Sequence, residues 1–265
     1  MTRVLSRHNP RLREVERLIG SSRDRRKSGR CVLEGVHLIG VYRERIGAPE
    51  LLVVVDEQRN DGAIATLVAM TPSADVLVVS RALFSEIATV PPDVGALAVV
   101  AAPRVPATAA PGALCLLLDG VQDPGNVGSI IRTAAAAGVD QVLLSPACAF
   151  AWSPKALRAG QGAHFLTSLI EDVALDGWCI DFRAGGGRVV ASVVDQRAVP
   201  VHDAALRGRL ALAIGSEGAG VSDAMLAVAD VRVTIPMAAG SESLNAGAAA
   251  AVLLFEAARQ RATAR

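Results

Sequence analysis

The stretch LLLDGVQDPGNVGSIIRTAAAAG, residues 116–138, changes within a few residues from an apolar run to an alanine-rich run. The first run is typical of a strand buried on both faces, and the second of a helix. A polar turn containing Asn126 lies between them, and Arg132 follows six residues later. Ligands of parallel α/β sheets bind beyond the carboxyl ends of the strands. The stretch therefore predicts an α/β sheet with Asn126 and Arg132 above a strand end. Read alone, it equally fits an Asn helix cap and a surface arginine.

Composition restricts the class of protein. Hydrophobic residues make up 51% of the 265 residues and aromatic residues only 3%, which favours tightly packed α/β layers. No apolar run reaches the roughly 18 residues of a membrane-spanning helix, and the charged N-terminus lacks the apolar core of a secretory signal. The four cysteines are scattered without ligand spacing. We therefore expect a reduced, cytoplasmic protein without a metal site.

A Pro/Ala-rich segment suggests two domains. The sequence AAPRVPATAAPGA, residues 101–113, contains few residues that could fill a core and is typical of an extended linker. Short β-branched runs alternate with helical patterns on both sides of it, and the apolar runs after it favour a parallel sheet. We expect an N-terminal α/β domain over residues 1–101, a linker over 102–112 and a second α/β domain over 113–265.

Two further loops of the second domain combine glycine with polar residues. AIGSEGAGVS, residues 213–222, follows a predicted strand, and its glycines let the backbone approach a ligand closely. Glu217 within it would repel phosphate, and no Walker or dinucleotide-binding motif is present. The second loop follows the strand that ends at Ile235-Pro236-Met237, where Ser243 or its neighbour is expected to cap a long helix. Each loop alone also fits an ordinary turn.

Together the three loops resemble the motifs of the SpoU-class (TrmH family, SPOUT superfamily) RNA 2′-O-ribose methyltransferases. The family pattern N-x-G-x-x-x-R matches Asn126 through Arg132, G-[SA]-E-G matches Gly215 through Gly218, and I-P-M…S-L-N matches Ile235 through Asn245. The resemblance covers residues from about 113 to 260, and the start with CVLEGVHLI is similar to the family's substrate-binding domain. Ala246-Gly247 departs from the Val-Ser that relatives often carry.

The resemblance implies a fold, a cofactor and an assembly. The fold would be a SPOUT domain with a deep C-terminal trefoil knot, joined to a small ribosomal-protein-like RNA-binding domain. The cofactor would be S-adenosylmethionine, and the chain would act as a homodimer with its active site near the interface. The catalytic residues implied are Asn126, Arg132, Glu217, Ser243 and Asn245, and the cofactor-binding residues implied are Gly215, Ser216, Gly218, Ile235, Met237, Ser243 and Leu244.

The role of Arg132 stays open. The family arginine is sometimes described as a base, but a guanidinium with a pKa above about 12 is a poor base at neutral pH. We prefer Arg132 as a phosphate anchor and as a stabiliser of the developing alkoxide. Asn126 would orient the hydroxyl or Arg132. Arg158, in the stretch KALRAGQGAHF, either contacts phosphate or donor or has a plain helix-end role.

The first 30 residues are strongly basic. They hold ten arginines and lysines against three acids, a net charge of +7 on a chain whose net charge is +1. A solvated helix face is the ordinary alternative, but the density in RDRRKSGR favours nucleic acid. With few aromatics, recognition by backbone and shape is expected. The candidate RNA-binding residues are Arg7, Arg11, Arg23, Arg25, Arg26, Lys27 and Arg30.

Three functions are compatible with these observations. The first is methylation of a ribose 2′-hydroxyl in 23S ribosomal RNA, and the second is the same reaction on transfer RNA. The third is a non-catalytic RNA-binding or ribosome-assembly protein. The sequence names neither the methylated nucleotide nor whether the modification serves ribosome maturation or antibiotic resistance.

Overall fold

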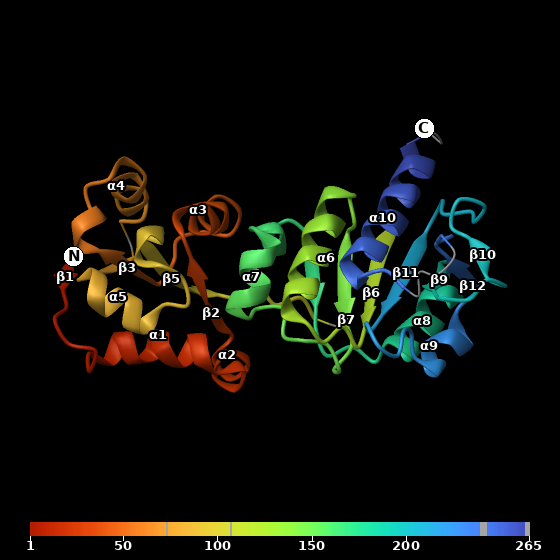
Figure 1. The fold of residues 1–265 in the computed structure, drawn as a ribbon, viewed down its shortest axis with the longest axis horizontal. Coiled ribbons are helices and arrows are strands. Elements are labelled where there is room, and N and C mark those ends of the chain that lie inside the picture. Colours follow the sequence, from red (N-terminus) through yellow and green to blue (C-terminus); the bar gives the residue numbers. More distant parts are fainter. Residues whose placement is uncertain (73, 107, 239–242, 263–265) are drawn as a thin grey trace. The chain divides into compact units, whose positions relative to one another are not determined.

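The computed structural model describes residues 1–72, 74–106, 108–238 and 243–262 of the chain (Figure 1). The chain divides into two compact units. The first comprises Met1–Pro103 and Trp152–Phe165, and the second comprises Arg104–Ala151 and Leu166–Arg265. Among the described residues, no helix is both long and apolar enough to cross a membrane.

The first unit is built on a five-stranded sheet of order β1-β4-β3-β5-β2. Its strands are β1 (Thr2–Arg3), β2 (Arg30–Glu34), β3 (Leu51–Val55), β4 (Asp75–Val79) and β5 (Ala96–Ala101). Strand β5 runs antiparallel to both β2 and β3, and the other pairs are parallel. The helices and 3₁₀ turns are α1 (Pro10–Gly20), α2 (Ser22–Ser28), α3 (Val36–Arg45), η1 (Asp56–Gln58), α4 (Gly62–Ala69), α5 (Arg81–Ile87), η2 (Pro92–Val94), α7 (Pro154–Gly160) and η3 (Ala163–Phe165).

The core of the first unit lies between the sheet and two helices. Leu12 and Val15 of α1 and Phe84 of α5 pack with alternate strand residues such as Val53 and Leu97, all buried. The period of 3.6 in the helices and of 2 in the strands brings these apolar side chains to one layer. Helices α3 and α4 lie on the other side of the sheet (Figure 1).

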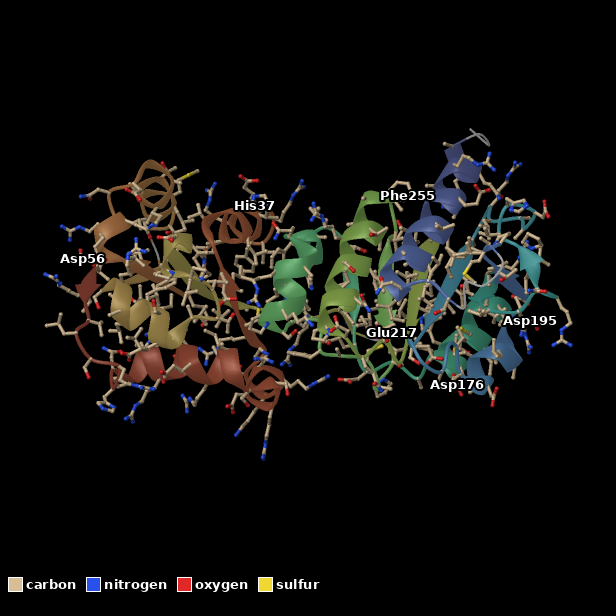
Figure 2. The ribbon with its side chains drawn as sticks, viewed as in Figure 1. His37, Asp56, Asp176, Asp195, Glu217 and Phe255 are labelled. Atoms are coloured by element: carbon tan, nitrogen blue, oxygen red, sulfur yellow. The ribbon has the colours of Figure 1, made fainter. Side chains whose placement is uncertain are left out.

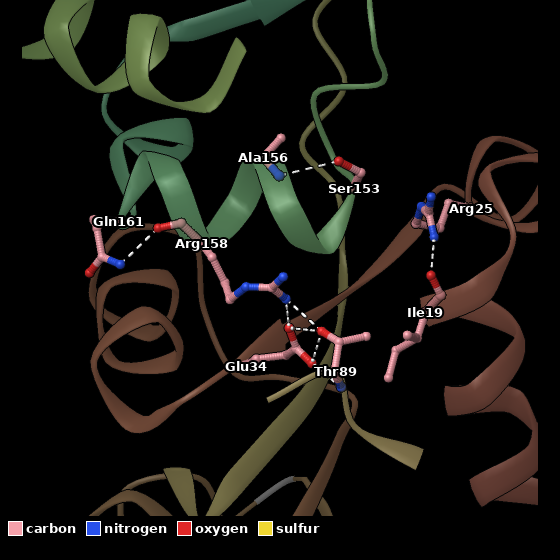
Figure 3. A network of polar contacts seen from close by, with 8 residues as sticks. All are labelled: Ile19, Arg25, Glu34, Thr89, Ser153, Ala156, Arg158 and Gln161. Carbon is pink, nitrogen blue, oxygen red and sulfur yellow. Dashed lines mark hydrogen bonds and ion pairs between the residues drawn. The ribbon is translucent and has the colours of Figure 1, made fainter. Parts of the chain in front are cut away.

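The segment Trp152–Phe165 belongs to the first unit, although the sequence-based boundaries assign it to the second domain. Trp152 and Leu157 are buried, and Phe165 meets Tyr42 of α3 edge-to-face. Arg158 of α7 donates hydrogen bonds to the buried carboxylate of Glu34 and to Thr89 Oγ1 (Figure 3). Apolar burial and this ion pair hold the segment there, and a boundary drawn from linker composition cannot reveal either.

The second unit contains a seven-stranded sheet of order β10-β12-β9-β11-β6-β7-β8, in which every pair is parallel. Its strands are β6 (Leu114–Asp119), β7 (Gln141–Leu144), β8 (Ser168–Ile170), β9 (Arg188–Ser192), β10 (Val199–Pro200), β11 (Leu210–Gly215) and β12 (Val231–Thr234). Its helices are α6 (Pro124–Ala136), α8 (Leu175–Ala184), α9 (Asp223–Val228) and α10 (Ala246–Ala262). The predicted α/β class with a parallel sheet is confirmed.

Helices cover both faces of this sheet. Cys179 and Phe182 of α8 and Met225 of α9 pack on one face. Helices α6 and α10 pack against each other, and α10 also contacts β11 (Figure 1). Strands covered on both sides must be apolar throughout, which explains runs such as LCLLLD in β6. The carboxyl ends of β6 and β11 are neighbours, because Asp119 lies opposite Gly215 in the register.

Candidate active site

Helix α6 begins earlier than the sequence suggests. Asp123 is its N-cap, with Oδ1 accepting a hydrogen bond of 3.0 Å from the Asn126 backbone N–H, and Pro124 occupies the first helical position. Proline is favoured there because its fixed φ suits the helix and its missing N–H has no partner to lose. The expected start near Val127 and the possible Asn126 cap are therefore wrong. Asn126 lies in the first turn, and its side-chain amide is not used for capping.

The side chain of Asn126 connects the other two loops. Its Nδ2 donates to Glu217 Oε1 at 2.5 Å, and its Oδ1 accepts from Asn245 Nδ2 at 3.0 Å. Glu217 lies in the loop that follows β11 (Figure 2). One residue from each of the three motifs thus belongs to a single hydrogen-bonded chain, which we call the Asn126–Glu217–Asn245 chain.

Asn245 has a second contact that fixes its position. Its Oδ1 accepts hydrogen bonds from the backbone N–H groups of Gly247 at 2.9 Å and Ala248 at 3.4 Å, so Asn245 caps α10. The cap at this turn is therefore Asn245, two residues beyond Ser243, and the expected cap at Ser243 or its neighbour is wrong. The Asn245 side-chain carbonyl caps the start of α10, and its amide donates to Asn126. The two contacts together determine which end of the side-chain amide group faces each partner.

The loop after β11 folds back tightly on itself. Ser216 and Gly220 exchange two backbone hydrogen bonds of 3.0 Å, and Gly220 has a φ of +70°. A Cβ placed on Gly215 would lie 1.9 Å from the carbonyl carbon of Gly220 and 2.1 Å from the Val221 nitrogen. No side chain fits at that distance, so only glycine is compatible with this close approach.

Asp119 ties this loop to the end of β6. Its Oδ2 accepts a hydrogen bond of 2.8 Å from the backbone N–H of Ser222, whose own hydroxyl caps α9. The sequence analysis did not single out Asp119 as functional. The parallel pairing of β6 with β11 is what brings it close to Ser222, and no local signal indicates that pairing.

A cavity of about 550 Å³ opens beside the glycine-rich loop. Its lining includes Gly215, Ser216, Glu217 and Gly218 of that loop, and Ser243 and Leu244 before α10. The predicted cofactor residues Ile235 and Met237 are not among the described residues that line it. The other lining residues are Ser192, Val193, Val194, Ile214, Ala219, Gly220, Val221, Leu226, Ala246 and Ala249.

The lining of the cavity combines polar and apolar groups in similar proportion. Val194, Leu226 and Leu244 supply apolar side chains, and Glu217 is the one charged group among the described lining residues. Sequence reasoning missed Val193 and Val194, which follow β9. Their run lacks glycine and polar motif residues, so only the position of β9 next to β11 identifies them.

Arg132 stands apart from the Asn126–Glu217–Asn245 chain. It lies on α6 with an exposed side chain and makes no hydrogen bond or ion pair with any residue that the structure describes. No described contact joins it to Asn126. The Arg132 guanidinium is accordingly available to a group of another molecule.

The candidate RNA-binding arginines differ in their surroundings. Arg25 is buried, 5% exposed, and its Nη1 donates to the carbonyl oxygens of Leu18 at 2.6 Å and Ile19 at 2.8 Å. Burial lowers the pKa of its guanidinium below the usual range. This burial speaks against the expected contact of Arg25 with RNA, because little of its side chain is left exposed to a phosphate. The other six predicted residues are exposed or half-buried.

Two further features concern the cysteines and the candidate metal ligands. Burial raises the pKa of Cys31, Cys115 and Cys179 to about 12, so these thiols are unreactive at neutral pH. Within the described part of the chain, no group of three or more His, Cys, Asp or Glu side chains is placed to hold a metal ion.

Comparison with known proteins identifies the class. Residues 113–255 match the SpoU rRNA Methylase family. The 23S rRNA (guanosine(2553)-2′-O)-methyltransferase RlmP of Bacillus subtilis is 31% identical over 96% of this chain and 98% of its own. The crystal structure of the SpoU methyltransferase AviRb from Streptomyces viridochromogenes, in complex with the cofactor AdoMet, superposes with a TM-score of 0.86 at 28% identity, covering 97% of this chain and 100% of that one.

A more distant structure matches less of the chain. The TrmH/SpoU tRNA modifying enzyme of A. aeolicus gives a TM-score of 0.52 at 27% identity, covering 57% of this chain and 76% of that one. Fold and site thus define an α/β RNA methyltransferase that uses S-adenosylmethionine. The chain belongs to the SpoU rRNA Methylase family.

Proposed function

We propose that this chain transfers a methyl group from S-adenosylmethionine to a ribose 2′-hydroxyl of large-subunit ribosomal RNA. The observation that carries the proposal is the Asn126–Glu217–Asn245 chain beside a cofactor-sized cavity. Polar groups that converge from three loops at the carboxyl edge of a parallel sheet are typical of a catalytic site.

The cavity suits the cofactor chemically. S-adenosylmethionine supplies an electrophilic methyl group on a positively charged sulfur. Apolar side chains such as Val194 and Leu244 can contact an adenine ring, and the backbone of the glycine-rich loop offers hydrogen bonds. The Glu217 carboxylate complements a positive charge, whereas a phosphate would be repelled. The tight Gly215 turn keeps this wall of the cavity in place.

The transfer needs a ribose hydroxyl held in line with the methyl group. Asn126 is fixed on both sides, by Glu217 and Asn245, and is placed to orient the hydroxyl. Arg132 carries the only expected catalytic charge with no described protein partner, which favours a role toward RNA. As an always-protonated group it would anchor a phosphate and stabilise the developing alkoxide, and the proton would leave late or to water.

Ribosomal RNA is favoured over transfer RNA as the substrate, because the RlmP and AviRb relatives match a larger share of this chain than the tRNA modifying enzyme does. The RlmP and AviRb comparisons extend over nearly the whole chain, including the basic first unit. The match to the tRNA modifying enzyme covers 57% of it. An RNA substrate of this kind also favours a cytoplasmic location.

We further propose a homodimer that forms through the second unit, and a threaded C-terminal knot. Val252 and Phe255 of α10 are 41% and 52% exposed, and Leu244 at the cavity rim is 40% exposed. Figure 2 labels Phe255 on α10. Large apolar side chains along one helix favour a protein contact over solvent. The residues before α10 line the cavity, as a chain threaded below the two loops requires.

The test compares Arg132→Ala and Arg132→Lys with the unmodified protein. We expect calorimetry to give the same S-adenosylmethionine affinity for all three, and methyl incorporation into 23S transcripts to fall by at least about 100-fold in Arg132→Ala. Mapping of 2′-O-methyl positions in RNA from cells lacking the gene would name the nucleotide. Donor binding without incorporation into any RNA pool would favour the non-catalytic alternative.

A further inference from the structure

The ten basic residues of the first 30 do not form one uniform charged surface. Arg7 pairs with Glu16 at 3.2 Å, and Arg11 pairs with Asp75 at 3.1 Å. Arg30 pairs with Glu14 and with Glu50. These three arginines therefore already have carboxylate partners within the protein. Affinity for a polyanion comes from cations that exchange their counterions for phosphates, so paired cations contribute less.

Arg25 builds the corner between α1 and α2. Its guanidinium is buried and donates to the carbonyl of Leu18 near the end of α1. It also donates to the carbonyl of Ile19 (Figure 3). Those carbonyls have no partner within a helix, and a cation at a helix C-terminus is favourable. Ser21 ends α1 and caps α2, with its hydroxyl accepting from the Asp24 N–H. The direction of α2 relative to α1 is thus fixed by one buried arginine and one serine.

With α2 held in this way, Arg17, Arg23 and Lys27 face solvent. Arg23 and Lys27 are four residues apart on α2, a spacing that brings side chains to the same side of a helix. Arg17 of α1 and Lys27 line one hollow of about 260 Å³. Arg17, Arg23 and Lys27 are exposed, and none of their side chains makes a hydrogen bond or ion pair with a residue in the described ranges. We call these three residues the corner cations.

The hollow is not uniformly positive. Glu14 and Asp24 also line it, together with Leu18, Ser28 and Arg30. Glu14 is already paired with Arg30, and the backbone N–H of Asp24 is held by Ser21. The corner cations therefore outnumber the unpaired carboxylate of Asp24. The Ser28 hydroxyl donates to the Asp24 carbonyl.

We propose that the corner cations Arg17, Arg23 and Lys27 are the docking surface for the phosphate backbone of the RNA substrate, and that Arg7 and Arg11 are structural. The inference rests on the proposed RNA methyltransferase function. The proposed RNA contact is thereby limited to the junction of α1 and α2, whose geometry Arg25 stabilises. Few aromatic side chains are present in the chain, so charge and shape rather than base stacking give the contact.

The test uses two double variants with the same loss of charge. Arg23→Gln/Lys27→Gln removes two corner cations, and Arg7→Gln/Arg11→Gln removes two paired arginines. Filter binding of transcribed, unmodified 23S RNA is measured between low and moderate salt. We expect the corner variant to bind at least about 10-fold more weakly, with a log–log salt slope shallower by roughly 1.5, because each lost phosphate contact removes about 0.7–0.9. The paired-arginine variant should stay within about 3-fold of the unmodified protein.

Equal losses in both variants would show that net charge alone matters and would overturn the inference. Unchanged binding in the corner variant would do the same. Both variants should keep the S-adenosylmethionine affinity of the unmodified protein, which verifies that the second unit is intact. Failure of the proposed function looks different: the unmodified protein would bind the transcript and the donor without incorporating methyl groups, and the comparison of the two variants would still be valid.

Discussion

Asn126 donates a hydrogen bond of 2.5 Å to Glu217, a residue 91 positions further along the chain. The contact joins the first turn of α6 to the loop that follows β11, and Asn245 completes it from the third loop. Each of the three residues alone fits an ordinary turn or cap. Their convergence on one amide is the basis for the catalytic site that we propose at the carboxyl edge of the second sheet.

Substitution of Glu217 separates the carboxylate's charge from its hydrogen bond. Glu217→Gln keeps an Oε1 acceptor for Asn126, so we expect methyl transfer to fall by less than about 10-fold. Glu217→Ala frees the Asn126 amide, and a misplacement of about 1 Å can cost roughly 100-fold in rate. Single-turnover methylation assays measure both. An equal loss in the two variants would assign the effect to charge instead of position.

Gly215→Ala should disrupt the cavity wall. The added methyl would meet backbone atoms of Gly220 and Val221 at about 2 Å, and overpacking of this kind costs about 1–3 kcal/mol. We expect a lower Tm and S-adenosylmethionine affinity weaker by at least about 10-fold, measured by thermal melting and calorimetry. Gly177→Ala on α8 is the matched control, because nothing lies within 4 Å of a Cβ there and Gly177 does not line the cavity. Equal effects of the two substitutions would contradict the explanation.

Asp119 acts as a positioning residue for the same wall. Asp119→Ala removes the acceptor for the Ser222 N–H, and an intramolecular hydrogen bond contributes a net of about 0.5–1.5 kcal/mol. We expect the dissociation constant for S-adenosylmethionine to rise by about 10-fold. Asp119→Asn retains an oxygen acceptor and should restore most of the affinity in calorimetric titrations. If the Asn variant were as defective as the Ala variant, the carboxylate charge rather than the hydrogen bond would be required.

The ion pair of Glu34 and Arg158 should contribute to stability rather than to chemistry. The Glu34 side chain is 1% exposed, so Arg158→Met leaves a buried carboxylate with only Thr89 as its partner. Removing one member of a buried pair costs about 3–5 kcal/mol, an upper value here because Arg158 is 36% exposed. Urea unfolding should show this loss, and Glu34→Gln in the same chain should recover part of it. A stable Arg158→Met variant without methyl transfer would place Arg158 at the substrate instead.

Much of the fold could be predicted from the sequence because apolar periodicity is a local property. The runs LCLLLD and LALAIG indicate buried parallel strands, and β6 and β11 are the central strands of the second sheet. The short strands β8 and β10 contain too few residues for such a pattern and were not predicted. Helix α2 was missed for another reason, because SRDRRKS has no apolar face to reveal it.

The site was predicted less evenly. Motif residues of three loops were expected together, and Asn126, Glu217 and Asn245 do form one chain. The capping of α6 could have been predicted from DPGN, because Pro124 is favoured at the first helical position and therefore indicates Asp123 rather than Asn126 as the cap. Charge counting likewise could not reveal that Arg25 is buried, since only the α1–α2 packing determines this. Apolar cavity residues such as Val194 become visible only from strand order.

The chain passes between the two units three times, at residues 103–104, 151–152 and 165–166. A fragment beginning at Arg104 would therefore carry α7 away from Glu34 and Tyr42 and expose the buried Trp152 and Leu157 to water. A recombination event in the Pro/Ala-rich linker alone would join a foreign first unit to a helix that evolved against this one. Exchange of the whole first unit between relatives would then have to include α7, so the coding sequence of this unit is discontinuous in the gene.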